Sequence, residues 1–414
     1  METPVTDLPT DAAAAPPLKQ LRVIDASSLV AGPYCAKLFA DFGAEVVKVE
    51  PPRGDEARRR EPFLDDRPGP ETSGTFLYLN LNKRGVTIDL ERAEGRELFR
   101  RLLADADILI EDRSPAENER LGLDYASLRE INPDLIVTSI TPFGQTGPYR
   151  DYKAYPLNTF HSSGQGYLLP MNSADRSREP VKGASFIGEC DAGLTAAIAT
   201  LGALLWRDAG GSGQHIDVSK QHALMHLEKS QLRRYVDDGA SPNRTGMGRL
   251  LETLVKGKDG QYVVIILSSE IQWRGLFEAM GRPTWGAEPP FNTQAGRSEN
   301  YPELRERLQR WADDHTADEI FHMVQGQRSA CAPVNPAESF VNSPQIEDRG
   351  FLHEVDHPVA GTLRYPGRPF QFSNVAWKPQ RPAPLLGQHN AAVLGDELGL
   401  TPQELVKLTE AGVI

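Results

Sequence analysis

The sequence has little cysteine. Cys35, Cys190 and Cys331 are the only ones in 414 residues, and none belongs to a C-x-x-C pair. This excludes a disulfide framework and predicts a reducing compartment, the cytoplasm. No apolar run reaches the roughly 18–20 residues of a membrane span, so no transmembrane segment is expected. The start of the chain is acidic and rich in alanine and proline, without a basic segment. Residues 1–20 are therefore expected to be a disordered leader rather than a signal peptide.

The motifs of several common sites are missing as well. No G-x-G-x-x-G follows the first expected strand and there is no Walker loop, which leaves nicotinamide, flavin and phosphate-loop sites unsupported. The nine histidines show no metal-binding spacing, so no metal is assigned. There is no G-x-S-x-G turn of a serine hydrolase. The net charge of -12 argues against nucleic acid or an anionic membrane as the main partner.

From Leu21 onward, buried strand patterns alternate with helix patterns. A strand at 21–26, a helix at 34–42 and a strand at 45–50 come first, and the alternation returns over 94–139. Strands that alternate with helices form parallel sheets covered on both faces, so the predicted fold class is α/β with a doubly wound sheet. Such sheets bind ligands in a crevice at the carboxyl ends of their strands.

A second domain is predicted further along the chain. A long helix over 219–238 and a polar, glycine-rich stretch precede a strand at 261–267, and three helices follow that strand. This mixture is typical of a small α+β domain. We expect a large domain over 21–220, a small domain over 221–335, and a linker with a C-terminal return to the large domain over 336–414.

The most informative segment is 188–193, Gly-Glu-Cys-Asp-Ala-Gly, which opens a long helix of small residues. A carboxylate after a glycine at the start of a helix lies where backbone N–H groups and the helix dipole favour negative charge. Glu189 is therefore a candidate nucleophile or base. Asp191 points to a different face of the helix and is interpreted as a helix N-terminal acid. Cys190 has no histidine near it in sequence and is interpreted as a buried bystander.

A set of short motifs resembles the class III CoA-transferases, the family of formyl-CoA:oxalate and carnitine CoA-transferases and 2-methylacyl-CoA racemases. None is diagnostic alone, but their order and spacing are specific to the family. They are A-G-P (31–33), G-A-E-V-V-K-V-E (43–50), L-N-K-R-G (81–85), I-D-L (88–90), A-D-I-L-I-E (106–111), R-L-G-L (120–123), G-Q-T-G-P-Y (144–149), G-Q-H-I-D-V (213–218) and P-L-L-G-Q-H (384–389).

The resemblance implies a fold and a mechanism. A Rossmann-like large domain and a small domain joined by two long linkers would form a ring-shaped subunit, and two rings would form an interlocked dimer. Coenzyme A thioesters would be substrates, with a carboxylic acid as the second substrate and no tightly bound cofactor. An aspartate would attack the acyl-CoA thioester to give a mixed anhydride and then an aspartyl-CoA thioester.

The resemblance also assigns CoA contacts. The backbone of Ile88 would meet the adenine, and Arg120 and Lys153 would contact phosphate or pantetheine, as cations suit phosphates. Arg53 is expected to replace a phosphate-binding arginine that the family has just after Glu50. Residues 244–251 are expected to reach the acid pocket. The expected CoA-binding residues are Ala31, Ile88, Asp112, Arg113, Arg120 and Lys153.

The chain departs from the family at the site itself. Glu189 stands where the family has its nucleophilic aspartate, and the extra methylene moves the carboxylate by about 1 Å, an error that can cost about 100-fold in rate. Val30 replaces a glutamine and cannot donate a hydrogen bond, and Asp112-Arg113 replaces Asn-Phe. Tyr155 and Pro156 replace the histidine-aspartate pair of the racemases, so racemase activity is not expected.

Three interpretations follow from these departures. The favoured one is a non-catalytic subunit of a heteromer whose homologous partner carries the aspartate, as in the succinyl-CoA:benzylsuccinate CoA-transferase of anaerobic toluene degradation. The second is a homomeric CoA-transferase that uses Glu189 as its nucleophile. The third is a CoA-binding regulatory protein without activity.

Overall fold

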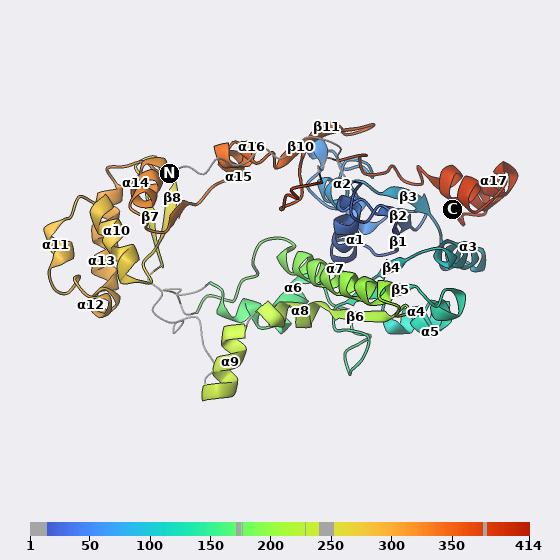
Figure 1. Cartoon of the computed structure of the whole chain (residues 1–414), viewed down its shortest axis with the longest axis horizontal. Helices are drawn as coiled ribbons and strands as arrows, with labels where there is room; N and C mark the ends of the chain where they lie inside the picture. Colours follow the sequence, from blue (N-terminus) through green and yellow to red (C-terminus); the bar gives the residue numbers. More distant parts are fainter. Residues whose placement is uncertain (1–14, 171–174, 176, 228, 240–251, 376–378) are drawn as a thin grey trace. The chain divides into compact units, whose positions relative to one another are not determined.

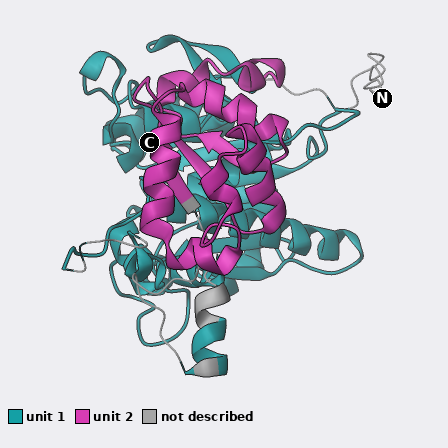
Figure 2. Ribbon diagram, turned by 90° about the vertical axis from the view of Figure 1, so that its left-hand side faces the viewer, with its two compact units in different colours: residues 1–245, 351–414 teal, residues 246–350 magenta. Residues whose placement is uncertain are grey.

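A computed structural model describes residues 15–170, 175, 177–227, 229–239, 252–375 and 379–414 of the chain (Figure 1). It divides into two compact units, residues 1–245 with 351–414 and residues 246–350 (Figure 2). The segment 244–251, expected to reach the acid pocket, lies outside the described residues.

Unit 1 is built on a parallel sheet. Its strand order is β3-β2-β1-β4-β5-β6 and every neighbouring pair is parallel. The order reverses between β1 and β4, the position at which doubly wound sheets bind ligands beyond the strand carboxyl ends. The strands are β1 (Arg22–Asp25), β2 (Glu45–Glu50), β3 (Arg84–Thr87), β4 (Ile108–Glu111), β5 (Ile136–Thr141) and β6 (His215–Ser219).

Helices cover both faces of this sheet, which explains why its strands are apolar on both sides. On one face, α1 (Ala31–Asp41) and α7 (Ile187–Asp208) pack with α8 (Lys220–Leu227) over Val23, Ile108 and their neighbours. The other face carries α3 (Ala93–Ala104), α5 (Tyr125–Ile131), the π-helix Ala391–Glu397 and α17 (Pro402–Glu410). The remaining elements of unit 1 are α2 (Gly74–Leu79), α4 (Pro115–Leu121), α6 (Pro156–Ser162), α9 (Lys229–Asp238), β10 (Leu352–His357), β11 (Gly361–Pro366) and three short 3-10 turns.

Unit 2 has its own hydrophobic core around an antiparallel sheet of order β7-β8-β9. Apolar residues of the three strands and of the surrounding helices, such as Val263, Leu276 and Leu308, are fully buried in it. Its elements are β7 (Glu252–Lys256), β8 (Tyr262–Ile266), β9 (Cys331–Pro333), α10 (Glu270–Ala279), α11 (Thr284–Ala287), α12 (Gln294–Glu299), α13 (Tyr301–Ala312), α14 (Ala317–Gly326), α15 (Ala337–Val341) and α16 (Pro344–Asp348).

The structure differs from the expected boundaries in four places. The small domain was expected at 221–335, but α8 packs on α6 and α7 and therefore belongs to unit 1. Unit 2 extends to residue 350, so the C-terminal return to unit 1 begins at 351 and not at 336. The helix expected over 219–238 consists of α8 and α9. Of the leader expected over 1–20, residues 1–14 lie outside the described residues, whereas 17–20 form a turn in which the Leu18 N–H donates to the Phe42 carbonyl at 3.1 Å.

By length and composition, α7 could cross a membrane, and it is the one such helix among the described residues. The expectation that no segment would qualify is wrong by these two criteria. Half of its apolar window is buried inside the protein, where α7 packs on α1, β5 and α8. This packing is typical of a core helix.

Candidate functional site

Glu189 lies in the first turn of α7, as the sequence predicts, and only 4% of it is exposed. Two glycines allow α7 to begin this close to its neighbours. A Cβ on Gly188 would meet Leu224 of α8 at 3.0 Å, and a Cβ on Gly193 would meet the Ala31 carbonyl oxygen of α1 at 2.5 Å. The turn of α7 that carries Glu189 therefore packs closely against α1 and α8.

The Glu189 carboxylate is not free. Lys220, the first residue of α8, donates from Nζ to Glu189 Oε2 at 2.7 Å, and the two side chains are only 15% and 5% exposed. A buried ion pair of this length fixes both groups, because separating them would leave an uncompensated charge. Lys220 was not predicted as a site residue, because it lies 31 positions from Glu189 in the sequence.

Asp112 is a second carboxyl group at this site. Its Oδ2 accepts hydrogen bonds from the Ser28 backbone N–H at 2.9 Å and from the Ser28 hydroxyl at 3.1 Å. Burial raises the pKa of Asp112 to about 6, although the Lys220 ammonium and the Ser28 N–H favour its ionised form. Lys220 thus acts electrostatically on both Glu189 and Asp112.

The raised pKa gives a pH-dependent prediction for Asp112→Asn. The folded pKa exceeds the unfolded value, so ionising Asp112 costs stability, and this cost is absent below about pH 4 and complete above about pH 6. The amide can still accept from Ser28. We expect the variant to be about 2 kcal/mol more stable than the wild type at pH 7.5, and the gain to shrink to a fraction of that at pH 4. Urea unfolding at both pH values measures it.

Asp124→Asn is the matched control for this prediction. At Asp124 burial is outweighed by hydrogen bonds from Ser127, and the carboxyl pKa is lowered. This variant should lose stability at pH 7.5 relative to pH 4. An equal gain for Asp112→Asn at both pH values would show that the charge of Asp112 is not the cause.

Buried ion pairs support the loop that carries Ser28. At the end of β1, Asp25 accepts from Lys83 Nζ at 2.8 Å, and Lys48 Nζ lies 2.8 Å from Asp55 Oδ2 and donates to the Ser27 carbonyl. Leu29 adopts a φ of 60°, and its N–H donates to Asp55 Oδ1 at 3.0 Å. Buried charged side chains therefore hold the loop between β1 and α1 in place.

Ala31 and Ile88, expected near CoA, are both 1% exposed. Ala31 is the first residue of α1 and lies against Gly193, close to the helix turn that carries Glu189. The Ile88 N–H donates to the Glu50 carbonyl at 2.7 Å, so that backbone donor is already bonded. Only the carbonyl of Ile88 remains for the expected adenine contact.

Two of the expected CoA-binding residues, Arg113 and Arg120, are paired with the protein's own groups. Arg113 donates to the Ala26 carbonyl at 3.1 Å and lies 3.6 Å from Glu111. Arg120 is on the surface in a bidentate pair with Glu91, with both contacts at 2.7 Å. Any CoA contact by these two guanidinium groups would have to replace the existing partners.

Lys153 and Arg53 are both exposed. Arg58, which the sequence analysis did not single out, is the buried arginine beside Glu50. It donates to Glu50 at 2.7 and 2.8 Å and to Glu71 at 2.7 Å, so it holds the segment after β2 in place. Among the expected CoA contacts, the structure thus brings Ala31 and Asp112 to the Glu189–Lys220 pair, whereas Arg120 and Lys153 are surface residues.

The two other polar residues of the 188–193 segment are Cys190 and Asp191. Burial raises the pKa of the Cys190 thiol to about 11, so the reactive thiolate is rare at neutral pH. Burial also raises the pKa of the Asp191 carboxyl, and Asp191 lies just beyond the first turn of α7. Glu189 remains the carboxylate of this segment that faces the site.

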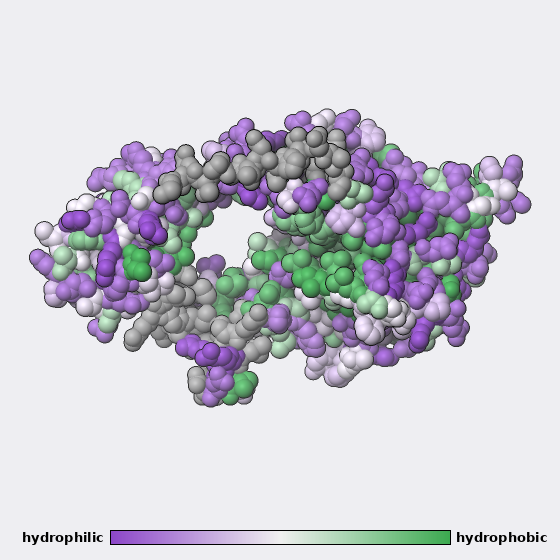
Figure 3. Space-filling view, viewed as in Figure 1, coloured by the Kyte–Doolittle hydropathy of each residue, from purple (hydrophilic) through white to green (hydrophobic). Residues whose placement is uncertain are grey.

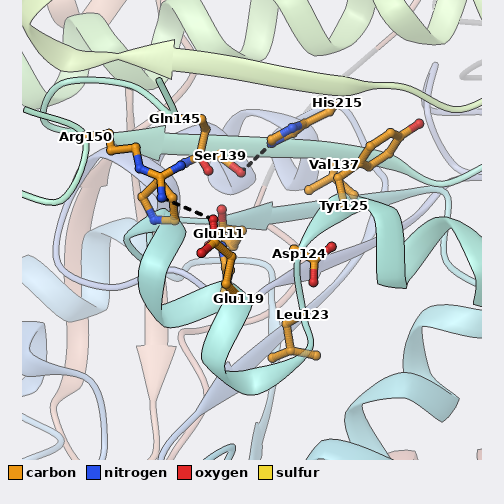
Figure 4. A pocket seen from close by; sticks show the side chains of 12 residues that line it. Glu111, Glu119, Leu123, Asp124, Tyr125, Val137, Ser139, Gln145, Arg150 and His215 are labelled. Atoms are coloured by element: carbon orange, nitrogen blue, oxygen red, sulfur yellow. Dashed lines mark hydrogen bonds and ion pairs between the residues drawn. The ribbon is translucent and has the colours of Figure 1, made fainter. Parts of the chain in front are cut away.

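A separate polar cavity of about 190 Å³ lies on the sheet face that α5 covers (Figure 4). Ser139 and His215 are hydrogen-bonded across it at 2.9 Å, and the Tyr125 ring stacks on His215. Glu111 Oε1 is buried there without a hydrogen-bond partner among the described residues. None of the expected CoA-binding residues lines this cavity, so it is distinct from the Glu189–Lys220 site.

Comparison with known proteins decides the family. The sequence profile described as CoA-transferase family III matches residues 18–390. This chain belongs to CoA-transferase family III. The resemblance inferred from the motifs is confirmed, and the enzyme class, CoA-transferase, with it.

Several relatives of this family III chain carry specific names. It is 31% identical over 409 residues to succinyl-CoA–D-citramalate CoA-transferase of Chloroflexus aurantiacus, covering 96% of this chain and 98% of that protein. It is 32% identical over 390 residues to succinyl-CoA:mesaconate CoA-transferase of Haloarcula hispanica, covering 92% and 96%. It is also 30% identical over 403 residues to the succinyl-CoA–L-malate CoA-transferase beta subunit of Chloroflexus aurantiacus, covering 96% and 98%.

Solved structures agree with this assignment. A CAIB/BAIF family protein from Brucella suis matches with a TM-score of 0.80 and 30% identity, over 92% of this chain and 100% of the other. A hypothetical protein from Mycobacterium tuberculosis matches with a TM-score of 0.78 and 27% identity, over 92% and 100%. The mixed α/β fold with a parallel central sheet is therefore confirmed.

Proposed function

We propose that this family III chain is the subunit of a heteromeric CoA-transferase that does not supply the nucleophile. The observation that carries the proposal is the Glu189–Lys220 ion pair, at 2.7 Å and almost fully buried. A carboxylate that attacks a thioester must reach a near-attack geometry with its negative charge available for the attack. Here the lysine holds the carboxylate and neutralises its charge, and the carboxylate also carries one methylene more than the family's aspartate.

The substrates that we propose are succinyl-CoA as the CoA donor and a dicarboxylic acid as the acceptor. Relatives named for succinyl-CoA with citramalate, mesaconate and malate support this choice, since all three acids are dicarboxylic. Benzylsuccinate, suggested by the sequence resemblance, is a substituted succinate of the same class. Coenzyme A enters and leaves as a thioester, and we propose no tightly bound cofactor.

A homologous subunit is the proposed partner, in an interlocked dimer of ring-shaped subunits. One relative named as a beta subunit supports a heteromer. An exposed apolar stripe on α7 repeats at near-heptad spacing and supports coverage by another subunit, as is typical of a helix covered by another surface. Figure 3 shows the hydrophobic side chains gathered over α7. The stripe consists of Ile187, Leu194, Ile198 and Leu205, which are 49%, 46%, 63% and 71% exposed.

We also propose that the protein works in the cytoplasm. Cys35, Cys190 and Cys331 are all free thiols, which suits a reducing compartment.

The test uses the chain alone and together with a co-encoded homologue that has Gly-Asp at the position of Gly188-Glu189. CoA exchange from succinyl-CoA to citramalate, mesaconate, malate and benzylsuccinate is measured for each sample. We expect no exchange by the chain alone and exchange by the mixture. In the mixture, Glu189→Gln should change kcat by less than about threefold, whereas replacing the partner's aspartate should remove activity by about 1,000-fold or more.

The other interpretations predict different results. Exchange by the chain alone that Glu189→Gln abolishes would establish Glu189 as a nucleophile and overturn the proposal. CoA binding without exchange in either sample would overturn it in favour of a regulatory protein. Thermal unfolding of Glu189→Gln is the control, because the amide can still bond Lys220 and should keep the fold.

A further inference from the structure

Lys220 places an amine where this family carries out acyl transfer. Its Nζ lies 2.7 Å from the carboxylate that occupies the nucleophile position, and Glu189 is its one hydrogen-bond partner among the described residues. With 15% of its side chain exposed, Lys220 is largely buried but still in contact with solvent. An amine and a proton acceptor are thus paired at the point that a thioester carbonyl would reach.

Lys220 has carboxyl groups close to its amine. It is the first residue of α8. The acidic groups that act on it are Glu189, in direct contact, and Asp112. Glu189 is therefore placed to take the proton that must leave before the amine can attack.

We propose that Lys220 is a self-acylation site that accepts the acyl group of an acyl-CoA thioester. Glu189 takes a proton from the Lys220 ammonium, and the amine attacks the thioester carbonyl carbon. A C–N bond forms, the C–S bond breaks, and the CoA thiolate leaves and is protonated by the carboxylic acid of Glu189. The products are an amide on Lys220, free CoA with its thiol, the regenerated Glu189 carboxylate and one proton released to solvent.

The same pair would prevent Glu189 from passing an acyl group on to the acceptor acid. If Glu189 attacked the thioester and formed a mixed anhydride, the amine of Lys220 would lie beside it. Attack by that amine on the acyl carbon would form the Lys220 amide and release the Glu189 carboxylate. Because an amide is far less reactive than an anhydride or a thioester, the acyl group would stay on Lys220 rather than pass to the acceptor acid.

The inference rests on the proposed function in one respect, namely that acyl-CoA reaches this site. The purified full chain is incubated with succinyl-CoA at neutral pH, and acylation of each lysine is followed over time by peptide mass spectrometry. Lys258 is the matched control, because its Nζ also pairs with a glutamate, Glu319 at 3.0 Å, but is 46% exposed and lies in unit 2. We expect Lys220 to be acylated about 100-fold faster than Lys258.

Two variants separate the chemistry from folding. Glu189→Gln should slow acylation of Lys220 by about 100-fold and leave Lys258 unchanged, because the proton acceptor is lost. Lys220→Arg keeps a cation beside Glu189 and should remove the fast acylation event. Equal rates at Lys220 and Lys258, or a rate at Lys220 that Glu189→Gln does not change, would overturn the inference.

The proposed function can fail separately. Fast acylation of Lys220 without CoA exchange in the presence of the homologue would keep this inference and overturn the heteromeric transferase. CoA exchange with the homologue, together with an unmodified Lys220 at saturating succinyl-CoA, would keep the heteromeric transferase and overturn the self-acylation of Lys220.

Discussion

Replacing Asp25 by alanine is expected to lower the free energy of unfolding by about 3–5 kcal/mol. Asp25 is completely buried at the end of β1, with Lys83 Nζ at 2.8 Å and Lys48 Nζ at 3.9 Å. Burial alone would raise its pKa, but the two lysines outweigh burial and hold the carboxyl pKa below its usual value. Removing the carboxylate would leave two ammonium groups in the core with too little compensating charge.

Urea unfolding at pH 7.5 measures this loss. Glu319→Ala removes the partner of Lys258 on the surface of unit 2 and should cost less than about 1 kcal/mol, which makes it the control for losing a lysine partner in general. Adding Lys83→Met to Asp25→Ala should restore part of the loss, because one unpaired cation is removed. If Asp25→Ala and Glu319→Ala cost the same, the buried pairs do not stabilise the loop between β1 and α1.

Lys220→Ala has the second largest expected effect, a loss of about 3 kcal/mol. The Glu189 carboxylate, of which 4% is exposed in the wild type, would lose its cation. An uncompensated charge in that position is costly, whereas a neutral amide is not. The double variant Glu189→Gln with Lys220→Ala should therefore recover most of the stability.

A double-mutant cycle gives the coupling directly. The free energies of unfolding of the wild type, Lys220→Ala, Glu189→Gln and the double variant are compared at one pH. We expect a coupling energy of about 2 kcal/mol, as found for charged groups in direct contact. A cost of Lys220→Ala that is the same with glutamate and with glutamine at position 189 would show that the two residues act independently.

Most strands of the parallel sheet could be predicted because they are short apolar segments that are recognisable in the sequence. The segments around Val23, Val46 and Ile108 are apolar on both faces, as strands of a sheet covered on both sides must be. β3 was not predicted as a strand, since Arg84-Gly-Val-Thr87 is short and has little hydrophobic character. The hairpin of β10 and β11 was not predicted, since residues 352–366 carry charged side chains and prolines among few apolar ones.

The candidate site was predicted in part. Glu189 at the start of a helix follows from local rules, and the structure places it there. The contact of Glu189 with Lys220 does not follow from local rules, because the packing of α7 on α8 brings the two side chains together. The family resemblance implied a phosphate contact for Arg120. The fold pairs the Arg120 guanidinium with Glu91, and this pair could not be predicted because the two residues are 29 positions apart in the sequence.

The buried pair of Glu189 and Lys220 also restricts how this protein can evolve. Recovering the family's nucleophile by Glu189→Asp alone would draw the carboxylate back from the ammonium by about one methylene and weaken the pair. Losing Lys220 first would leave the glutamate buried without a counter-charge. Both single steps are expected to lower stability. Placing an aspartate at position 189 without loss of stability therefore requires two coordinated substitutions.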